Sequence, residues 1–304
     1  MAVNREIWLD YISQNLFEDN PHLDKCIDNS AGVNAYTVHI PSAGTAATVT
    51  RNNTSYPVTV TERSDNDAYY TIDSFQVGPI RLDNADRYEL SYDKMRSVMN
   101  DFMMGLREEI GTWLNYKWAA SAAAYIVRTT GNALSTNLAN STATGTRKVL
   151  LAYDLMMAAK ALDDVPVPAQ NRWAMLDTTM YYELLNDLKF GEFRRTVEEA
   201  DLKRGIIPEL FGFGMLKRPT VFTYTNASTP VVKEPGAAAA TSDNRAAICW
   251  QADMVEKAMG SIDWWDTESA EHFTKDLIAA EIRFGGRKRR YDGAGVVSIV
   301  QAAG

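Results

Sequence analysis

The stretch YDKMRSVMNDFMMGLREEIGTWLNYKWAASAAAYIV, residues 92–127, contains the longest regular pattern of this sequence. Ser91 is a candidate N-cap for it, and Asp93 stands in the first turn, where the helix dipole favours a carboxylate. The pattern predicts one helix of about 54 Å over residues 92–127, which is long for a compact domain. Apolar side chains recur at steps of three or four residues, on one face of this helix, at Met95, Met99, Phe102, Leu106, Ile110 and Trp113.

The segment before this helix has a different chemistry. Residues 29–61 are rich in Thr, Val, Ala and Ser, and Arg51 is their only charged side chain. Residues 58–61 alternate with period two, and residues 69–75 predict a further strand that closes at Gly78-Pro79. The segment has few large side chains for a core of its own, and an uncharged strand edge invites pairing. We therefore expect an extended hairpin that something outside the subunit covers. Turn signals lie at Pro41-Ser42, Gly44 and Asn52-Asn53.

The chain after the long helix has the pattern of a separate α/β unit. A polar low-complexity patch over residues 129–146 marks the boundary. A short amphipathic helix is also predicted at the start of the chain, over residues 5–17. The predicted elements after the boundary are helices at 148–162, 178–187 (capped by Thr178) and 253–259, strands at 171–176, 221–225, 246–251, 277–284 and 296–302, and a loop at 227–245.

The composition excludes several classes of protein. The 304 residues are 46% hydrophobic, which provides material for a sizeable core. The formal net charge of −8 would repel a polyphosphate, so any contact with nucleic acid would have to be local. Cys26 and Cys249 are too few for a disulfide framework, and we expect reduced, mostly buried thiols. The sequence has neither a signal-peptide pattern nor a run of the ~20 apolar residues that span a bilayer, which indicates a cytosolic protein.

The sequence contains no recognisable catalytic constellation. His22, His39 and His272 are isolated and lack the spacing of metal ligands, so we expect surface or structural roles for them. No phosphate-binding glycine loop and no nucleophile elbow occur, and residues 212–214 (GFG) predict a turn. The acidic runs at 162–164 and 197–201 are typical of solvated faces. We therefore expect no cofactor, no metal and no enzyme activity. The rival from another class is an enzyme whose site these motifs do not reveal.

The order of these segments resembles that of the major capsid proteins of tailed bacteriophages, which have the Hong Kong 97-type fold. The likeness extends along nearly the whole chain and is closest to proteins from phages of gut Bacteroidetes. The stretches that carry it are REIWLDYISQNLFEDNPHLDKCIDNS (5–30), AYTVHIPSAGTAATVTRNNTSYPVTVTERSDNDAYYTIDSFQVGPIRL (35–82), ADRYELSYDKMRSVMNDFMMGLREEIGTWLNYKWA (85–119), NRWAMLDTTMYYELLND (171–187), GIIPELFGFGMLKRPTVF (205–222), AAICWQADMVEKAMGSI (246–262) and FGGRKRRYDGAGVVSI (284–299).

The resemblance implies an α+β fold with an N-terminal arm, an extended β-hairpin loop, a peripheral domain with a long spine helix, and an axial domain. On this sequence the spine helix is the one expected at about 92–127. The implied division is an arm at 1–35, the extended loop at 36–75, the peripheral domain at 76–145, the axial domain at 146–280, and closing strands of the peripheral domain at 281–304.

The function that the resemblance implies is structural. The chain would be a virion protein that assembles with itself, as hexamers and pentamers, into an icosahedral shell around double-stranded DNA in the cytoplasm of a bacterial host. The implied partners are a scaffolding protein, a portal, and decoration or cargo proteins. The packaged DNA would be contacted without sequence specificity, and no membrane is involved. An encapsulin-like shell that encloses cargo enzymes is the alternative within the same class.

Two departures from the family affect the expected assembly. Some members begin with a scaffolding segment of their own, whereas the arm here starts close to Met1, so we expect a separate scaffolding protein. Others link subunits covalently through a lysine of the extended loop, but no lysine occurs between Lys25 and Lys94. We therefore expect shells that are held by non-covalent contacts.

The most basic stretch of the chain, FGGRKRRYDG at residues 284–293, has two interpretations. Residues 281–292 carry five cations and two anions, hence a formal charge of +3 in a chain of −8. Such a patch favours phosphate through counterion release. Arginine is also well suited to bidentate pairing with carboxylates across an interface. We expect a subunit interface, with contact to DNA as the alternative, at Arg51, Arg287, Lys288, Arg289 and Arg290.

Overall fold

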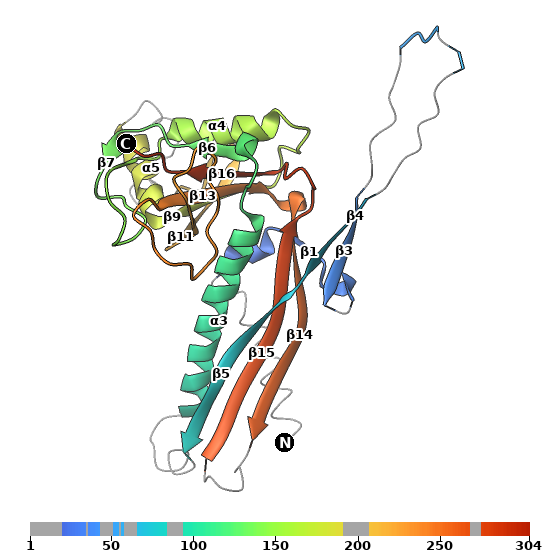
Figure 1. Cartoon of the computed structure of the whole chain (residues 1–304), viewed down its shortest axis with the longest axis vertical. Coiled ribbons are helices and arrows are strands. Elements are labelled where there is room, and N and C mark those ends of the chain that lie inside the picture. Colours follow the sequence, from blue (N-terminus) through green and yellow to red (C-terminus); the bar gives the residue numbers. More distant parts are fainter. Residues whose placement is uncertain are drawn as a thin grey trace.

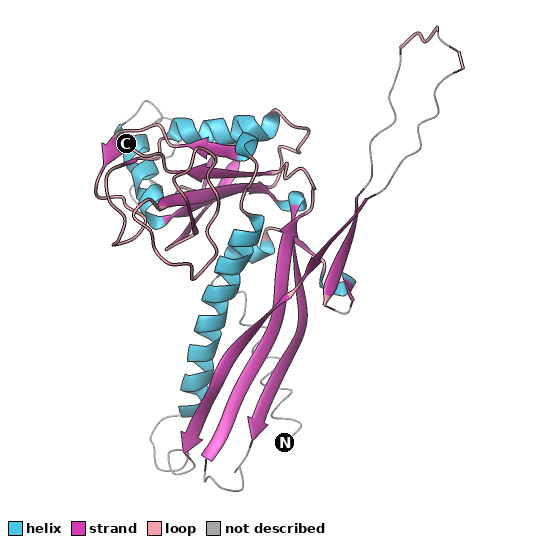
Figure 2. Ribbon diagram, viewed as in Figure 1, coloured by secondary structure: helices cyan, strands magenta, loops and turns pink. Residues whose placement is uncertain are grey.

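The computed structural model describes residues 20–34, 36–42, 51–54, 56–57, 66–83, 94–190, 207–267 and 275–304. Several predictions lie outside these residues: the helix at 5–17, the N-cap Ser91, the alternation at 58–61, the acidic run at 197–201, and His272. The described chain is a mixed α+β structure with two main sheets, which we call the long sheet and the head sheet (Figures 1 and 2).

The long sheet has four strands in the order β1-β14-β15-β5, and α3 (Lys94–Trp118) runs along it (Figure 2). At 25 residues this helix is about 38 Å long. Leu106, Ile110 and Leu114 are buried on the side that faces the sheet, which confirms the predicted apolar face for this part of the helix. The strands are β1 (Ile27–Asp28), β14 (Val255–Thr267), β15 (Lys275–Lys288) and β5 (Asp73–Asp83).

The helix ends at Trp118, so its predicted extension to residue 127 is wrong. Side chains from distant strands bind the backbone where the helix would continue. The Ala120 N–H donates to Ser298 Oγ at 3.0 Å, and Tyr224 OH donates to the Ala120 carbonyl at 2.6 Å. The chain then forms β6 (Ile126–Arg128), which pairs in parallel with β16 (Val296–Val300). These tertiary contacts override the helix propensity of the alanines.

The head sheet has strands in the order β10-β11-β9-β13-β16-β6, with β12 also paired to β13. The strands predicted at 171–176, 221–225 and 246–251 are confirmed as β9 (Arg172–Asp177), β12 (Phe222–Tyr224) and β13 (Asn244–Gln251). The predicted turn at 212–214 is a tight hairpin between β10 (Glu209–Leu210) and β11 (Phe213–Arg218), and Phe211 and Gly212 both have positive φ there.

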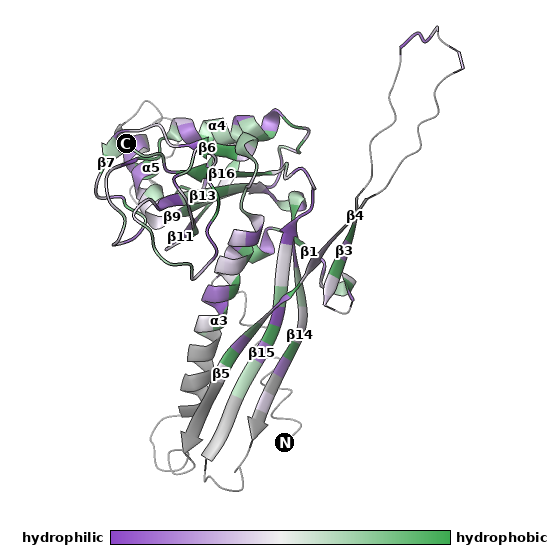
Figure 3. Ribbon diagram, in the orientation of Figure 1, coloured by the Kyte–Doolittle hydropathy of each residue, from purple (hydrophilic) through white to green (hydrophobic). Residues whose placement is uncertain are grey.

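The central strands of the head sheet, β13 and β16, are buried on both faces. Along β13, Ile248 and Trp250 pack towards α3, whereas Ala247 and Cys249 pack towards the helices of the opposite face. All five residues of β16 are buried, as expected for a strand covered on both sides. Figure 3 draws β16 largely in the hydrophobic colour. Two helices cover the second face: α4 (Ala152–Asp163) and α5 (Thr178–Phe190).

Two helix starts differ from their predictions. The predicted helix at 148–162 begins only at Ala152, because residues of β8 (Arg147–Lys148) pair with β7 (Ala133–Leu134). The N-cap of α5 is Asp177 rather than Thr178, because Asp177 Oδ1 accepts the backbone N–H of Thr179 at 2.9 Å. Short 3-10 helices lie at Pro21–Asp24, Ser30–Gly32, Ala123–Tyr125 and Ala252–Met254.

The predicted hairpin is confirmed for its described strands, but the predicted turn at Pro41-Ser42 is wrong, because both residues pair with β4. β3 (Thr37–Ser42) and β4 (Asn66–Thr71) pair from Thr37 opposite Thr71 to Ser42 opposite Asn66, and β2 (Val33–Asn34) completes a small sheet. In Figure 1 the described residues 51–54 and 56–57 lie at the far end of this hairpin, away from both main sheets. We call the part of the chain from β3 to β4, residues 37–71, the arm. It is a different segment from the N-terminal arm expected at residues 1–35.

The predicted strand end at Gly78-Pro79 is wrong. The strand breaks instead at Ile72, between β4 and β5, and β5 continues through Gly78-Pro79 to Asp83. Its register against β15 shifts between Ile278 and Ala280, so Gly78 and Pro79 lie in a bulge. Because β5 is also an edge strand of its sheet, a proline without an N–H is tolerated there.

Strand pairing places two segments, residues 253–259 and β16, in other sheets than the predicted division into peripheral and axial domains implies. Residues 253–259 were predicted as a helix and placed with residues 146–280, but most of them begin β14 of the long sheet, because pairing with β15 overrides their helical composition. β16 was predicted to close the peripheral domain, but it lies between β13 and β6. An apolar strand such as β16 needs cover on both faces, and the head sheet provides it.

Candidate functional site

The basic run of the sequence lies where the long sheet meets the head, by which we mean the head sheet together with α4 and α5. Arg287 and Lys288 end β15, and Arg289 and Arg290 begin the loop towards β16. This end of β15 is hydrophilic in Figure 3. We call residues 284–290 the junction run, and each of its four cationic side chains has a distinct partner.

The two glycines of the junction run allow close approaches on opposite faces of the long sheet. A Cβ on Gly286 would lie 2.3 Å from Leu114 Cδ1, so this glycine lets α3 pack against the sheet. A Cβ on Gly285 would lie 3.1 Å from the Cα of Ile72, so this glycine lies beneath the chain that passes from β4 to β5. Glycines inside a strand often mark such approaches of another backbone.

Arg287 and Lys288 each bind a backbone carbonyl of another element. Arg287 Nη1 donates to the carbonyl of Tyr69 in β4 at 2.8 Å. Lys288 Nζ donates to the carbonyl of Ala119 at 2.7 Å, just after the C-terminus of α3, where the helix dipole favours a cation. Burial, and next the positive charge of Arg287, lowers the pKa of Lys288.

Arg289 and Arg290 pair with carboxylates of the same chain. Arg289 Nε lies 3.4 Å from Glu256 Oε2, close enough for an ion pair but too poorly aligned for a hydrogen bond. Arg290 forms a bidentate pair with Asp292, at 3.1 and 2.7 Å. The side chains of Arg289 and Arg290 remain 40% and 36% exposed, so both still reach the surface.

Arg51 does not join the junction run. It is exposed and lies in the described segment at the far end of the arm (Figure 1). The structure therefore brings together Arg287, Lys288, Arg289 and Arg290, and it separates Arg51 from them.

The carboxylate of Glu256 is buried beside the junction run, with its residue 1% exposed. Burial raises the pKa of Glu256, while the neighbouring polar groups of Tyr70 and Asn29 and the charge of Arg289 oppose that shift. The pKa of Tyr70 is raised by burial and next by the charge of Glu256. Tyr70, at the base of the arm, therefore lies near the buried carboxylate of Glu256 at the end of the long sheet.

Sequence reasoning missed two contacts on the same face of the long sheet. The guanidinium of Arg283 lies 3.9 Å from the ring centre of Tyr36, at the base of the arm. Glu281, next along this face, accepts hydrogen bonds from Ser74 and Gln76 of β5. The sequence did contain a signal for these contacts, the adjacent glycines Gly285 and Gly286. Glycines within a strand indicate that another segment of the chain passes close by.

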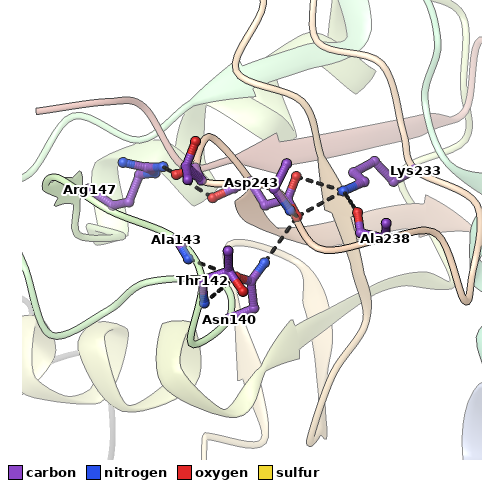
Figure 4. Close-up of polar contacts among 9 residues, drawn as sticks. Asn140, Thr142, Ala143, Arg147, Lys233, Ala238 and Asp243 are labelled. Atoms are coloured by element: carbon purple, nitrogen blue, oxygen red, sulfur yellow. Dashed lines mark hydrogen bonds and ion pairs between the residues drawn. The ribbon is translucent and has the colours of Figure 1, made fainter.

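A second polar cluster holds loops of the head together (Figure 4). Asp243 is buried and accepts hydrogen bonds from Lys233 Nζ at 2.9 and 2.8 Å, and from Asn140 Nδ2 at 3.0 Å. Burial alone would raise the pKa of Asp243, but the hydrogen bonds from Lys233 and Ala240 outweigh it, and the pKa is lowered. Arg147 donates to the carbonyls of residues 144, 146, 241 and 243. The cluster ties residues 140–147 to residues 233–243.

The remaining sequence candidates have structural surroundings. His22 is buried against Trp118, and burial, followed by the charge of Arg218, lowers its pKa to about 3. Cys26 and Cys249 are free thiols, as predicted, and burial raises the pKa of Cys26 to about 12. In the described part of the chain no group of three His, Cys, Asp or Glu side chains is placed to hold a metal. None of the helices described is long and apolar enough to cross a membrane.

Comparison of the sequence with known proteins finds no match, neither to a model of a protein family nor to a curated protein. The fold does match solved structures. The capsid structure of the cyanophage P-SCSP1u has a TM-score of 0.64 at 13% identity, over 90% of this chain and 86% of that chain. The capsid of Ralstonia phage GP4 has a TM-score of 0.64 at 10% identity, over 92% and 87% of the two chains. A virus-like particle from Pyrococcus furiosus has a TM-score of 0.55 at 10% identity, over 97% and 98%.

The chain therefore has the mixed α+β fold of phage capsid proteins, which confirms the fold class predicted from the sequence. At these identities the likeness concerns the fold, and it extends over nearly the whole length of both partners in each comparison.

Proposed function

We propose that this chain is the major capsid protein of a tailed bacteriophage, a structural subunit without enzyme activity that assembles with itself into an icosahedral shell around double-stranded DNA. The observation that carries the proposal is the shared fold over about nine tenths of the chain with subunits of phage capsids. Fold alone does not determine function. Here a second feature agrees with it, because the described residues 51–54 and 56–57 lie away from both main sheets, as suits a segment that contacts another subunit (Figure 1).

The other parts of the proposal follow from the family resemblance of the sequence. Residues 1–35 would serve as the N-terminal arm, and residues 36–75 as the extended loop of a Hong Kong 97-type subunit. The long sheet with α3 would form the peripheral domain, and the head would form the axial domain. The protein would assemble in the bacterial cytoplasm with a separate scaffolding protein and a portal, and it would end in the virion. The Bacteroidetes phages remain the proposed source of its nearest relatives.

We propose subunit contacts for Arg51 and for the exposed parts of the junction run. Arg51 is exposed at the far end of the arm, where a neighbouring subunit would meet it. Arg289 and Arg290 keep more than a third of their side chains exposed although they are paired within the chain. Arg287 and Lys288 would reach a neighbour or DNA only by giving up bonds to Tyr69 and Ala119.

A shell of another kind, such as a compartment for enzymes, is the second candidate in the same class. Phage capsids have TM-scores from 0.56 to 0.64, and the virus-like particle from Pyrococcus furiosus has 0.55. The agreement with several different phage capsids, rather than any one score, favours the phage capsid.

Assembly is the test of the proposed function. The chain should be expressed with and without candidate scaffolding proteins, and the products examined by native mass spectrometry and electron microscopy. We expect closed icosahedral particles built from subunits of 33.9 kDa. Because no lysine lies between Lys25 and Lys94, boiling these particles in detergent should release monomers. A protein that stays monomeric under all these conditions would contradict the proposal.

A further inference from the structure

The base of the arm is fixed to one spot on the long sheet. Between β4 and β5 the chain crosses the face opposite α3 at Ile72 (Figure 1). A Cβ on Gly260 would lie 2.6 Å from Ile72 Cδ1, and one on Gly285 would lie 3.1 Å from both the Cα and the Cγ2 of Ile72. Two glycines on neighbouring strands therefore form the seat for this one residue. The N–H of Ile72 also donates to the carbonyl of Tyr36 at 3.0 Å.

Two arginines bracket this seat on the same strand. Successive side chains of a strand alternate between faces, so Arg283, Gly285 and Arg287 share the face that the arm crosses. Arg283 stacks on the ring of Tyr36, and Arg287 donates to the carbonyl of Tyr69. One contact therefore holds the start of the arm, before β3, and the other holds its return, in β4.

The described residues at the base of the arm have only a small apolar core. The apolar core beneath the arm consists of Val38, Ile72 and Ala258, with Val33 and Tyr70 packed against it. Such a small core is a weak restraint on direction, because a two-stranded hairpin is marginal in water by itself. The arginine contacts lie on either side of it and resist rotation about Ile72.

We propose that Arg283 and Arg287 are positioning residues that clasp the base of the arm and set its direction relative to the long sheet before subunits meet. The inference rests on the proposed function, because it takes the arm to be the part that contacts a neighbouring subunit. A fixed direction lowers the entropy that each subunit loses on association. Arg287 then acts mainly within its own subunit, where it holds the arm. The junction run contributes to assembly because it fixes the direction of the arm.

The test uses a pair of double variants with equal numbers of changes. The clasp variant carries Tyr36→Leu and Arg287→Ala, which removes the aromatic ring and the bond to Tyr69. Its matched control carries Tyr36→Phe and Arg290→Ala, which keeps the ring and removes only the pair with Asp292. Changing Tyr36 rather than Arg283 leaves the ion pair of Arg283 with Glu281 intact. Tyr36 has a positive φ of 67°, and leucine and phenylalanine meet the same backbone strain there.

The direction of the arm can be measured on unassembled subunits by double electron–electron resonance. Spin labels are attached to cysteines placed at Asn52, near the end of the arm, and at Tyr291, whose side chain is exposed. Both native cysteines are replaced by serine in all the labelled proteins, because Cys26 is only partly buried. We expect one narrow distance distribution for the wild-type and control proteins, and a distribution at least about twofold broader for the clasp variant, whose hairpin base has lost its directional contacts.

Assembly supplies the second readout. At limiting protein concentration the clasp variant should give about tenfold fewer closed particles than the control, or particles of mixed diameter, with little change in the midpoint of thermal unfolding. Equal distance distributions, or normal particles despite a broadened distribution, would overturn the inference. If the wild-type protein forms no particles at all, the proposed function fails, and the resonance experiment still decides whether the clasp exists.

Discussion

The head sheet and the long sheet share one core through α3, but they differ in what covers their faces. In the head, β13 and β16 are buried on both faces, by α3 on one side and by α4 and α5 on the other. The main apolar surface of the long sheet faces α3, and of the described residues only the small core of Val38, Ile72 and Ala258 lies on the other face. Its other face carries the polar contacts of Glu281 and Arg283, the crossing of the arm at Gly285, and Trp265, which is 49% exposed.

This difference separates two tasks within one chain. Residues that bury both faces of a sheet stabilise the subunit, whereas a polar face and an extended arm contribute little to folding and remain free for contacts. We therefore expect substitutions in the head and along α3 to change the free energy of unfolding. Substitutions on the open face and in the arm should change assembly instead.

The largest effect is expected where the two sheets meet. Trp118 is fully buried between them, packs against Trp250, and donates from Nε1 to the carbonyl of Glu256. Trp118→Ala should lower the free energy of unfolding by about 4 kcal/mol, measured by urea denaturation of the soluble subunit. Trp265→Ala, on the open face, is the matched control and should change it by less than about 0.5 kcal/mol. Similar losses for both tryptophans would break the distinction between the two sheets.

The next largest effect is expected in the polar cluster of the head. Asp243 has a side chain 3% exposed and pairs with Lys233, so Asp243→Asn should cost about 3 kcal/mol at neutral pH. Asp292→Asn removes an exposed pair and should cost about 0.5 kcal/mol. Equal costs for the two substitutions would count against a stabilising role for this cluster.

The pH dependence of the Asp243 effect has a definite sign. The folded state lowers the pKa of Asp243, so its contribution is complete above the ordinary aspartate pKa of about 3.9 and is lost as the pH falls through the lower value. The difference in the free energy of unfolding between the wild-type protein and Asp243→Asn should stay constant from about pH 8 to pH 5 and shrink below about pH 4. A difference that grows on acidification would contradict this assignment. Urea denaturation of both proteins at each pH measures this difference.

A smaller effect is expected at the start of α4. Asp187 of α5 accepts the backbone N–H of Ala152, the first residue of α4, at 2.8 Å. Asp187→Ala should cost about 1 kcal/mol, as for loss of a helix cap. Asp164→Ala removes only the exposed pair with Lys160 and should cost less than about 0.5 kcal/mol. The midpoints of thermal unfolding of the two variants, measured side by side, test whether this bond between α5 and α4 stabilises the head.

The sequence predicted those parts of the fold that depend on local pattern. The apolar stripe that includes Leu106 and Ile110 predicted α3, and composition predicted the strand at Arg172–Asp177. The turn predicted at residues 212–214 lies one residue earlier, at Phe211-Gly212. The C-terminus of α3 was not predictable in this way. Its alanines favour a helix, and only Ser298 and Tyr224, far along the chain, bind the backbone at Ala120.

The sheet to which a strand belongs was harder to predict, because pairing is non-local. For β16 a signal was present, since VVSIV is apolar at successive positions and indicates a strand covered on both faces. For the junction run, the charges were visible in the sequence but their partners were not. The carbonyls of Tyr69 and Ala119 become available only once the arm and α3 are in place.

The most direct test of the account is to shorten the arm. Ser42 and Asn66 are directly opposite each other in the hairpin, so residues 43–65 can be replaced by Asn-Gly, which favours a two-residue turn. Native mass spectrometry and electron microscopy should then be applied to the wild-type and shortened proteins at equal concentration, with urea denaturation of both. We predict closed shells from the wild-type protein, and soluble subunits of unchanged stability but no closed shells from the shortened one. Normal shells from the shortened protein would contradict the account.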